Sequence, residues 1–171
     1  MLILEFPNEK HRAAYDDLVR AWRQAETPTA PGRLFAGTDF DEFLSIVQRD
    51  LTASGPASVP AHLFFLADTD RATLFGAIQI RHHIDHPTVR ESGGHIGYGI
   101  CPGQRRKGYA TTMLALAIVE AKKIGLGRLL VTCRDTNWGS RKVIESNGGV
   151  FERTTIDERQ LARRYWISNK Q

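Results

Sequence analysis

The sequence has few cysteines, no long apolar run and no features of a secretion signal, and each absence excludes a class of protein. Two cysteines in 171 residues are too few for a disulfide framework or a cysteine-rich zinc site. No stretch of 18 or more apolar residues is present, so a transmembrane helix is not expected. Residues 1–6 lack the basic start and the extended apolar core of a signal peptide. We therefore expect a cytoplasmic protein with reduced thiols and no membrane partner.

The length and composition are typical of one globular domain, and we expect residues 1–171 to form it. The chain is 42% hydrophobic and 25% charged, which are ordinary values for a domain with its own core. The net charge of +4 is unevenly distributed, because residues 101–171 hold 14 of the 23 Lys and Arg residues but 6 of the 19 Asp and Glu residues. A basic last third fits contact with an anion such as a nucleotide phosphate, and it fits a solvated basic face equally well.

Hydrophobic periodicity predicts two helices near the N-terminus, then antiparallel strands, then an alternation of strands and helices. A strand is expected over residues 2–6, and helices are expected after Asn8 and from residues 38–41 onward. The later pattern predicts strands at 62–67, 73–82 and 95–101, a buried helix at 110–123, a strand at 128–133, a helix at 137–148, and strands near 150–154 and 165–168. This order predicts an α+β or mixed α/β fold.

The most informative segment joins the strand at 95–101 to the following helix. It reads Arg105-Arg106-Lys107-Gly108-Tyr109-Ala110, with the hydroxyl of Thr111 one residue further on. The first N–H groups of a helix have no intrahelical partner and lie at the positive end of the helix dipole, so this junction is a candidate anion site. Gly108 and Ala110 leave room for a phosphate to approach the backbone. The spacing matches neither the Walker loop nor the dinucleotide motif Gly-x-Gly-x-x-Gly.

This junction resembles the [Arg/Gln]-x-x-Gly-x-[Gly/Ala] signature of the GNAT superfamily of N-acetyltransferases, which is here Arg105-x-x-Gly108-x-Ala110. A second family pattern follows the next strand, where Asn137 and Ser140 open a small helix that ends in glycine. The segments GGHIGY (residues 93–98) and RYWI (residues 164–167) look like one subgroup of predicted acetyltransferases. The resemblance covers residues 62–168.

The resemblance implies a central mixed, mostly antiparallel sheet with helices on both faces and a splayed parallel pair of strands at 95–101 and 128–133. It implies acetyl-CoA as co-substrate, a pantetheine arm between those strands and a pyrophosphate at the amides of residues 106–111. The implied coenzyme contacts are Ile100, Cys101, Arg105, Arg106, Lys107, Gly108, Tyr109, Ala110, Thr111, Asn137 and Ser140. Asn137 is also explained as a helix N-cap, and both roles can hold together.

The catalytic candidates are His95 and Tyr98. Family members often carry a Tyr seven residues after the Asn as the acid, and this chain has Ile144 there. The two candidates alternate on a regular strand, so one faces the coenzyme cleft and the other faces packing. Histidine suits base catalysis near neutral pH, although a lone strand His is more often structural. Cys133 and Tyr165 are further substitutes for the acid, with burial as the simpler explanation for Cys133.

We therefore expect an N-acyltransferase that moves an acetyl group from acetyl-CoA to a primary amine by direct attack in a ternary complex. The acceptor is a small-molecule or peptide amine that the sequence does not name. The alternative is a non-catalytic acyl-CoA-binding regulatory module, which the missing tyrosine supports. A nucleic-acid partner is not expected, because the basic last third lacks a stripe of basic and aromatic residues. No metal site is expected at His82, His83 and His86, and a homodimer stays open.

Overall fold

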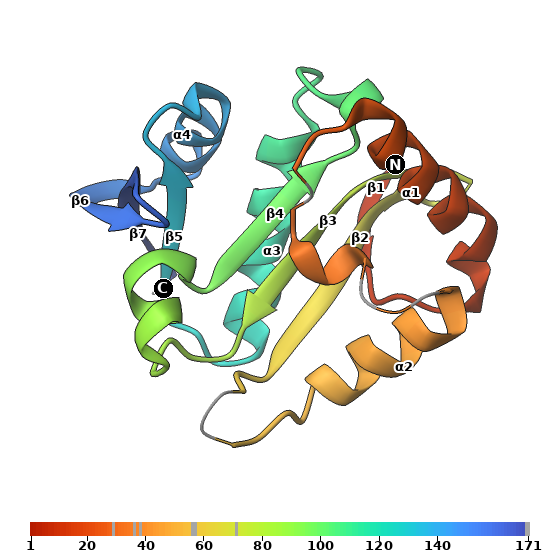
Figure 1. Ribbon diagram of the computed structural model, residues 1–171, viewed down its shortest axis with the longest axis horizontal. Coiled ribbons are helices and arrows are strands. Elements are labelled where there is room, and N and C mark those ends of the chain that lie inside the picture. The colour runs from red at the N-terminus through yellow and green to blue at the C-terminus, as the bar shows by residue number, and fades with distance from the viewer. Residues whose placement is uncertain (29, 36, 38, 56–57, 71, 170–171) are drawn as a thin grey trace.

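A seven-stranded mixed sheet with helices on both faces forms the frame of the molecule (Figure 1). This computed structural model describes residues 1–28, 30–35, 37, 39–55, 58–70 and 72–169. The elements in chain order are β1 (Leu2–Glu5), η1 (Glu9–His11), α1 (Arg12–Ala25), η2 (Gly32–Phe35), α2 (Phe40–Asp50), β2 (Ala61–Asp68), β3 (Leu74–Arg81), η3 (Val89–Gly93), β4 (Ile96–Ile100), η4 (Pro102–Gln104), α3 (Tyr109–Lys123), β5 (Arg128–Arg134), α4 (Trp138–Ser146), β6 (Val150–Asp157) and β7 (Gln160–Ser168). Here η3 is a π-helical turn and the other η elements are 3-10 helices.

The strand order is β1-β2-β3-β4-β5-β7-β6, and every neighbouring pair is antiparallel except β4 and β5. This confirms the predicted mixed, mostly antiparallel sheet. The parallel pair shares a single register pair, Ile96 with Val131, preceded by a hydrogen bond from the His95 N–H to the Leu130 carbonyl. Beyond this point β4 and β5 diverge toward their C-terminal ends (Figure 1). The splay between them is therefore part of the backbone itself.

Alternation of side chains along the strands gives the sheet two apolar faces. On one face, Ile78 and Ile96 pack in a cluster with buried residues of α3 such as Met113. On the other face, Ala77 and Phe65 pack in a second cluster with buried residues of α1 and α2, which are Ala14, Tyr15, Leu18, Trp22, Phe40, Phe43 and Val47. Period-two alternation places successive strand residues on opposite faces, which explains why both clusters draw on the same strands.

The helices begin and end near the predicted positions, and their caps show why. Asn8 accepts from the Lys10 N–H and caps η1, which leads into α1. Asp39 accepts from the Glu42 N–H at 2.9 Å and caps α2, whereas Thr38, the first residue of the predicted helix start, lies outside the described residues. The longest helix, α3, has 15 residues. Within the described ranges, no helix is long and apolar enough to cross a membrane.

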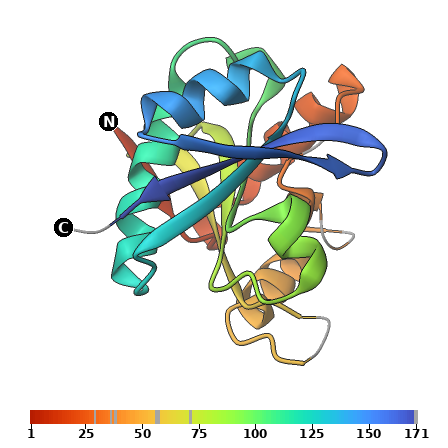
Figure 2. The same ribbon diagram turned by 90° about the vertical axis from the view of Figure 1, so that its left-hand side faces the viewer.

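The last two strands are longer than the sequence predicted, and three short helical turns were missed. β6 and β7 form a hairpin over Val150–Asp157 and Gln160–Ser168, drawn in blue nearest the viewer in Figure 2. β6 is an edge strand with most side chains in solvent, so its sequence shows no apolar alternation. Turns η2, η3 and η4 lie between the helices and strands that the sequence predicted, since short turns leave little periodic signal.

Candidate active site

The loop between β4 and α3 presents a row of free backbone donors. Arg106 (φ 62°) and Gly108 (φ 84°) adopt left-handed conformations, and Gly108 is the N-cap of α3. The first bond into the helix runs from the Thr112 N–H to the Gly108 carbonyl at 3.2 Å. In the part of the chain that the structure describes, no backbone carbonyl accepts from the N–H groups of residues 106–111. These donors lie at the positive end of the α3 dipole, which is the geometry of an anion site.

The space above these donors is open. A Cβ atom added at Gly108 would meet no heavy atom within 4 Å. Arg106 and Lys107 are exposed beside it, so their charges add to the positive field. The Tyr109 ring packs against Phe75 with 4.5 Å between ring centroids, which fixes the start of the helix on the sheet. Ala110 and Thr111 are half-buried in the first turn. The loop can therefore receive an anion without rearrangement of packed side chains.

Arg105 has a different position from the one expected of a phosphate ligand. Its Nε donates to the Ile100 carbonyl at 3.1 Å, and its Nη2 donates to the Thr27 hydroxyl at 3.3 Å. The guanidinium also lies 6.0 Å from the centre of the Trp22 ring. This side chain ties the loop to the end of β4 and to the segment after α1. The structure therefore supports backbone contacts to an anion here more than a contact through Arg105.

The edge of β4 that faces β5 offers further backbone groups. In an antiparallel pair, successive residues direct their N–H and C=O groups alternately toward and away from the partner strand. The Cys101 N–H donates to the Phe75 carbonyl on β3, and its carbonyl accepts from the Gln104 N–H. Tyr98 and Ile100 occupy the alternate positions along β4, so their backbone N–H and C=O groups point away from β3, toward β5 and the splay. Of the two predicted contacts, Ile100 keeps its N–H available, whereas the backbone of Cys101 is already bonded within the protein.

Tyr98 is the hydroxyl donor that the structure places at the splay. Its Oη lies 2.7 Å from the Oγ of Ser140, in the first turn of α4. Asn137 caps that helix by accepting from the Ser140 N–H at 3.0 Å, which holds Ser140 in place. Burial raises the pKa of Tyr98 to about 12, and the bond to Ser140 opposes this in part. The phenol is therefore protonated at neutral pH and able to donate a proton.

A pocket of about 300 Å³ opens between the splayed strands. Residues 30–32 and Gly97 line it from one side, and Thr132 and Cys133 of β5 line it from the other. Three predicted site residues also line it: Tyr98, Asn137 and Ser140. The structure thus brings together residues from β4, β5 and α4 that are far apart in the sequence.

His95 joins the two parallel strands and does not line this pocket. The side chain is buried, and its ring nitrogen Nδ1 accepts from the backbone N–H of Leu130 at 2.9 Å. The backbone N–H of His95 donates to the Leu130 carbonyl at 2.8 Å. Burial, followed by the charge of Arg81, lowers the pKa of His95 to about 4. A neutral ring whose lone pair is already bonded is a poor base. The geometry therefore supports a structural role for His95, and its catalytic role stays a prediction.

The lowered pKa predicts how acid acts on stability. Between about pH 4 and 6.5 the unfolded chain binds a proton at His95 that the folded protein excludes, so this site destabilises the fold as the pH falls through that window. We expect His95→Asn, whose amide oxygen can accept from the Leu130 N–H, to lose less unfolding free energy on acidification than the wild type. Urea unfolding across that window measures the two slopes, and parallel slopes would contradict a buried neutral ring.

The remaining acid candidates from the sequence are Cys133, which lines the same pocket as Tyr98, and Tyr165, which does not. Burial raises the pKa of the Cys133 thiol, so Cys133 stays protonated in the pocket wall. The Tyr165 hydroxyl donates to the Glu145 carboxylate at 3.1 Å and is outside the pocket lining. Ile144 is fully buried in the cluster that includes α3. The position that often carries the family's tyrosine is therefore used for packing in this chain.

Two of the three histidines considered as a metal site, His82 and His83, interact with other side chains. His82 Nε2 lies 2.8 Å from His62 Nδ1, and His83 lies 3.3 Å from a carboxylate oxygen of Asp85. Across the residues that the structure describes, no group of three or more His, Cys, Asp or Glu side chains could hold a metal ion.

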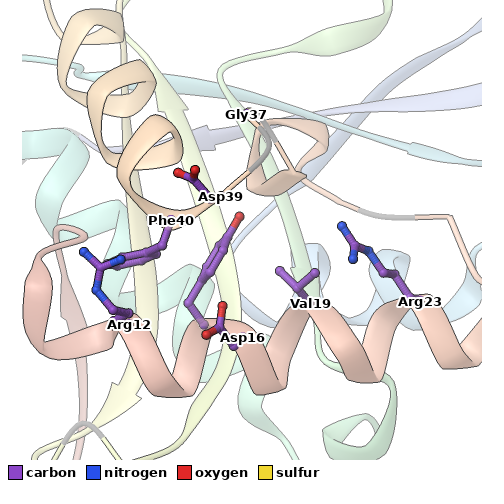
Figure 3. Close-up of a pocket in the computed structure, with 8 residues that line it drawn as sticks. Arg12, Asp16, Val19, Arg23, Gly37, Asp39 and Phe40 are labelled. Carbon is purple, nitrogen blue, oxygen red and sulfur yellow. The ribbon is translucent and has the colours of Figure 1, made fainter.

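A second pocket, of about 270 Å³, lies between α1 and α2 (Figure 3). Its lining consists of Arg12, Tyr15, Asp16, Val19, Arg23, Gly37, Asp39 and Phe40. Several of its polar groups already have partners. Arg12 pairs with Asp41 at 2.5 Å, and the Tyr15 hydroxyl donates to the Leu34 carbonyl at 2.9 Å. None of the predicted site residues lines this pocket, so we assign it no part in the chemistry at the splay.

Arg81 is a site residue that the sequence analysis missed. It is the last residue of β3 and lines the pocket at the splay. Its Nη1 donates to the carbonyls of Gly93 and Gly94, at 3.4 and 3.0 Å. The signal in the sequence is a lone arginine at the end of a strand whose other residues are mostly apolar. That pattern alone does not distinguish a pocket residue from a strand end in solvent.

Solved structures with a similar fold are acetyltransferases. RimL, described as a ribosomal L7/L12 alpha-N-protein acetyltransferase in complex with coenzyme A, has a TM-score of 0.70 and 17% identity, with 98% of this chain and 93% of that chain covered. A chimera of the spermidine N-acetyltransferase SpeG from Vibrio cholerae and hSSAT has a TM-score of 0.68, 17% identity and coverages of 98% and 95%. The putative acetyltransferase yncA from Salmonella typhimurium, solved with acetyl-CoA, has a TM-score of 0.63, 13% identity and coverages of 99% and 95%. At these identities the likeness shows the fold.

The family follows from the sequence match. A search of curated proteins found no match. Among models of protein families, the acetyltransferase (GNAT) domain matches residues 2–150, most of the chain. That range contains β1–β5, the loop before α3, and Tyr98 with Ser140. The chain therefore belongs to the GNAT acetyltransferase family.

Proposed function

We propose that this protein transfers the acetyl group of acetyl-CoA to a primary amine by direct attack within a ternary complex. The observation that carries the proposal is the Tyr98 hydroxyl, which is protonated at neutral pH and held by Ser140 in a pocket between the splayed strands. The free amides at the start of α3 provide a separate place for a phosphate group. An acid near the reacting bond and an anion site for the coenzyme are the two parts that the reaction requires.

The residues present fit the parts of coenzyme A. Its pyrophosphate would be held by the N–H groups of residues 106–111, above the open space at Gly108. Arg106 and Lys107 would add charge, and Thr111 would add a hydroxyl. Its extended pantetheine arm would bond to the free edge of β4 at Tyr98 and Ile100, with Asn137 and Ser140 across the splay. Acetyl-CoA supplies the activated thioester at the end of that arm.

Tyr98 would act on the leaving group. Attack by an amine nitrogen forms the new C–N bond and breaks the C–S bond, so the departing sulfur needs a proton while the attacking nitrogen must lose one. Tyr98 donates its Oη proton toward the sulfur, and Ser140 keeps that hydroxyl in place. The phenolate then regains a proton that the nitrogen has released to solvent. In sum, one proton moves from nitrogen to sulfur, and the enzyme returns to its starting state.

No side chain is needed as the base if the amine arrives neutral. His95 is the predicted base, but its Nδ1 is bonded to the Leu130 N–H and its pKa of about 4 makes it weakly basic. We therefore assign deprotonation of the nitrogen to solvent. The regulatory-module alternative was supported by the missing tyrosine at position 144, and Tyr98 now offers a hydroxyl at the splay from another element.

Initial-rate kinetics test direct attack. Both substrates must be bound before either product leaves, so double-reciprocal plots at varied acetyl-CoA and amine concentrations should intersect. Protein without amine should release no stoichiometric burst of free coenzyme A. Parallel lines together with an acetylated form of the protein, detected by intact mass, would contradict direct attack and point to a covalent intermediate, with Cys133 in the pocket wall as its first candidate.

A further inference from the structure

We propose that the acceptor is a small amine that also carries a carboxylate, and that Arg81 binds this carboxylate in the pocket at the splay. The inference rests on the proposed function and names the class of acceptor for the same site. It places an amino-acid-like molecule with its amine near Tyr98 and its carboxylate at the end of β3.

The guanidinium of Arg81 has donors to spare. Its two hydrogen bonds, to the Gly93 and Gly94 carbonyls, both use Nη1. An arginine has five N–H donors, so those on Nε and Nη2 remain for a ligand. Among the described residues, no carboxylate forms an ion pair with Arg81. Asp50 pairs instead with Arg33 on η2, at 2.6 Å. Burial, followed by the charge of Arg33, lowers the pKa of Arg81, as expected of a cation without a counter-charge.

The charge of the pocket lining selects the sign of the acceptor's second group. Arg81 is its one charged member, and the other lining residues that the structure describes are neutral. A polyamine would find no carboxylate in this pocket and would face a like charge. A carboxylate would instead form two parallel bonds with the planar guanidinium, and this pairing would offset the cost of its burial.

The size and the walls of the pocket favour a small molecule. The whole pocket has a volume of about 300 Å³, at the lower end of the range for small-ligand sites, and the end of the pantetheine arm would occupy its part at Asn137 and Ser140. The part that remains at Arg81 suits a small acceptor. Residues 30–32 form one wall, against β4. A Cβ added at Gly99 would lie 2.2 Å from the Ala30 carbonyl oxygen, so glycine is required for this close approach. The wall leaves Gly97, Arg81 and Tyr98 lining one shared space.

The guanidinium is held in position by the turn before β4. Gly94 supplies one of its two acceptor carbonyls and has a φ of 65°. A Cβ at Gly94 would lie 2.6 Å from the Leu130 carbonyl oxygen, so a larger residue would push β5 away. The same turn therefore fixes both the Arg81 side chain and the point from which the two strands splay.

Matched acceptors test the inference. The probes are the common amino acids, each beside its carboxamide and its decarboxylated amine, with spermidine as a polyamine. The wild type should use the carboxylate member of a pair best. Arg81→Gln should lower kcat/KM for that member by about 10- to 100-fold, mainly through KM, and change the carboxamide by less than about threefold. Arg81→Lys keeps the charge but not the planar fork of donors. Its kcat/KM for the carboxylate member should therefore lie between those of the wild type and Arg81→Gln.

The control variant is Arg20→Gln. It removes one positive charge from the exposed face of α1, where Arg20 pairs with Asp17, and should leave the preference unchanged. Melting curves check that each Arg81 variant is folded. If Arg81→Gln does not fold, the comparison of acceptors is made with Arg81→Lys. Calorimetric titration of the same acceptors into protein saturated with coenzyme A gives an affinity that does not depend on turnover.

The outcomes separate this inference from the proposed function. Three results with active protein would overturn the Arg81 inference and leave acetyl transfer standing. The wild type could use carboxylate and carboxamide equally, or it could prefer spermidine. Alternatively, Arg81→Gln could lower kcat/KM for the carboxylate and the carboxamide to the same extent. If no amine is acetylated, the proposed function fails. In that case, Arg81-dependent binding of carboxylate members would still support the inference, and equal binding of both members would overturn it.

Discussion

Gly108→Glu is expected to abolish acetyl-CoA binding while the protein stays folded. The substitution places a carboxylate in the open space above the amides of residues 106–111, where it would repel the pyrophosphate and occupy its donors. The left-handed backbone at Gly108 adds a strain of about 1–2 kcal/mol, which a folded domain tolerates. Calorimetric titration with acetyl-CoA should show an affinity at least about 100-fold weaker than that of the wild type.

Gly125→Glu is the matched control for this prediction. Gly125 also has a left-handed backbone (φ 85°), and a Cβ there would likewise meet nothing within 4 Å. It lies after the C-terminal end of α3, so the variant carries the same added charge and similar strain far from the free amides. Its affinity for acetyl-CoA should match that of the wild type. A folded Gly108→Glu protein with unchanged affinity would show that the coenzyme binds elsewhere.

Tyr98→Phe is expected to lower kcat by about 10²- to 10⁴-fold, the usual contribution of a general acid. Phenylalanine keeps the ring in place and removes the proton that Tyr98 donates, so acetyl-CoA affinity should not change. Because the pKa of Tyr98 is about 12, the wild-type kcat should show no loss from tyrosine ionisation up to about pH 10. Steady-state rates by thiol detection, together with calorimetric binding, separate the two effects.

Tyr165→Phe is the control for a lost tyrosine hydroxyl. Tyr165 is buried and donates to Glu145, but it does not line the pocket. We expect its kcat to stay within about threefold of the wild type, since a residue away from the reacting atoms supplies no proton to them. Wild-type turnover by Tyr98→Phe would remove the acid from the mechanism. A large loss in Tyr165→Phe alone would assign the acid to that residue.

The parts of the molecule that depend on local sequence could be predicted. The apolar stripe of α3 and the buried run in β5 gave those elements within a residue or two, because their period and composition are set by burial. The loop before α3 could be predicted for the same reason, since its glycine and its free amides are neighbours in the chain. The two strands of the edge hairpin β6–β7 were predicted but too short, because the exposed strand β6 shows no alternation that would mark its full length.

The parts that depend on distant contacts could not be derived from the residues alone. Tyr98 and Ser140 are 42 positions apart, and their hydrogen bond exists because β4 and β5 diverge after a single register pair. The sequence placed His95 beside Tyr98 as an equal candidate, yet its bond to Leu130 requires knowledge of which strands are neighbours. The lone arginine at the end of β3 did not identify Arg81 as a pocket residue, since its place there depends on residues 30–32 and on the turn at Gly93 and Gly94.

The most direct test of acetyl transfer at the splay is the release of free coenzyme A from acetyl-CoA by the wild-type protein, followed by thiol detection with and without an amine acceptor. The acceptors are the amino acids, carboxamides, decarboxylated amines and spermidine described above, with peptides added, and the N-acetylated product is identified by mass spectrometry. We predict saturable, amine-dependent release with one acetylated product per thiol, and its loss in Gly108→Glu. Tight binding of acetyl-CoA without thiol release for any amine would contradict this account and favour a regulatory module that binds the coenzyme without catalysis.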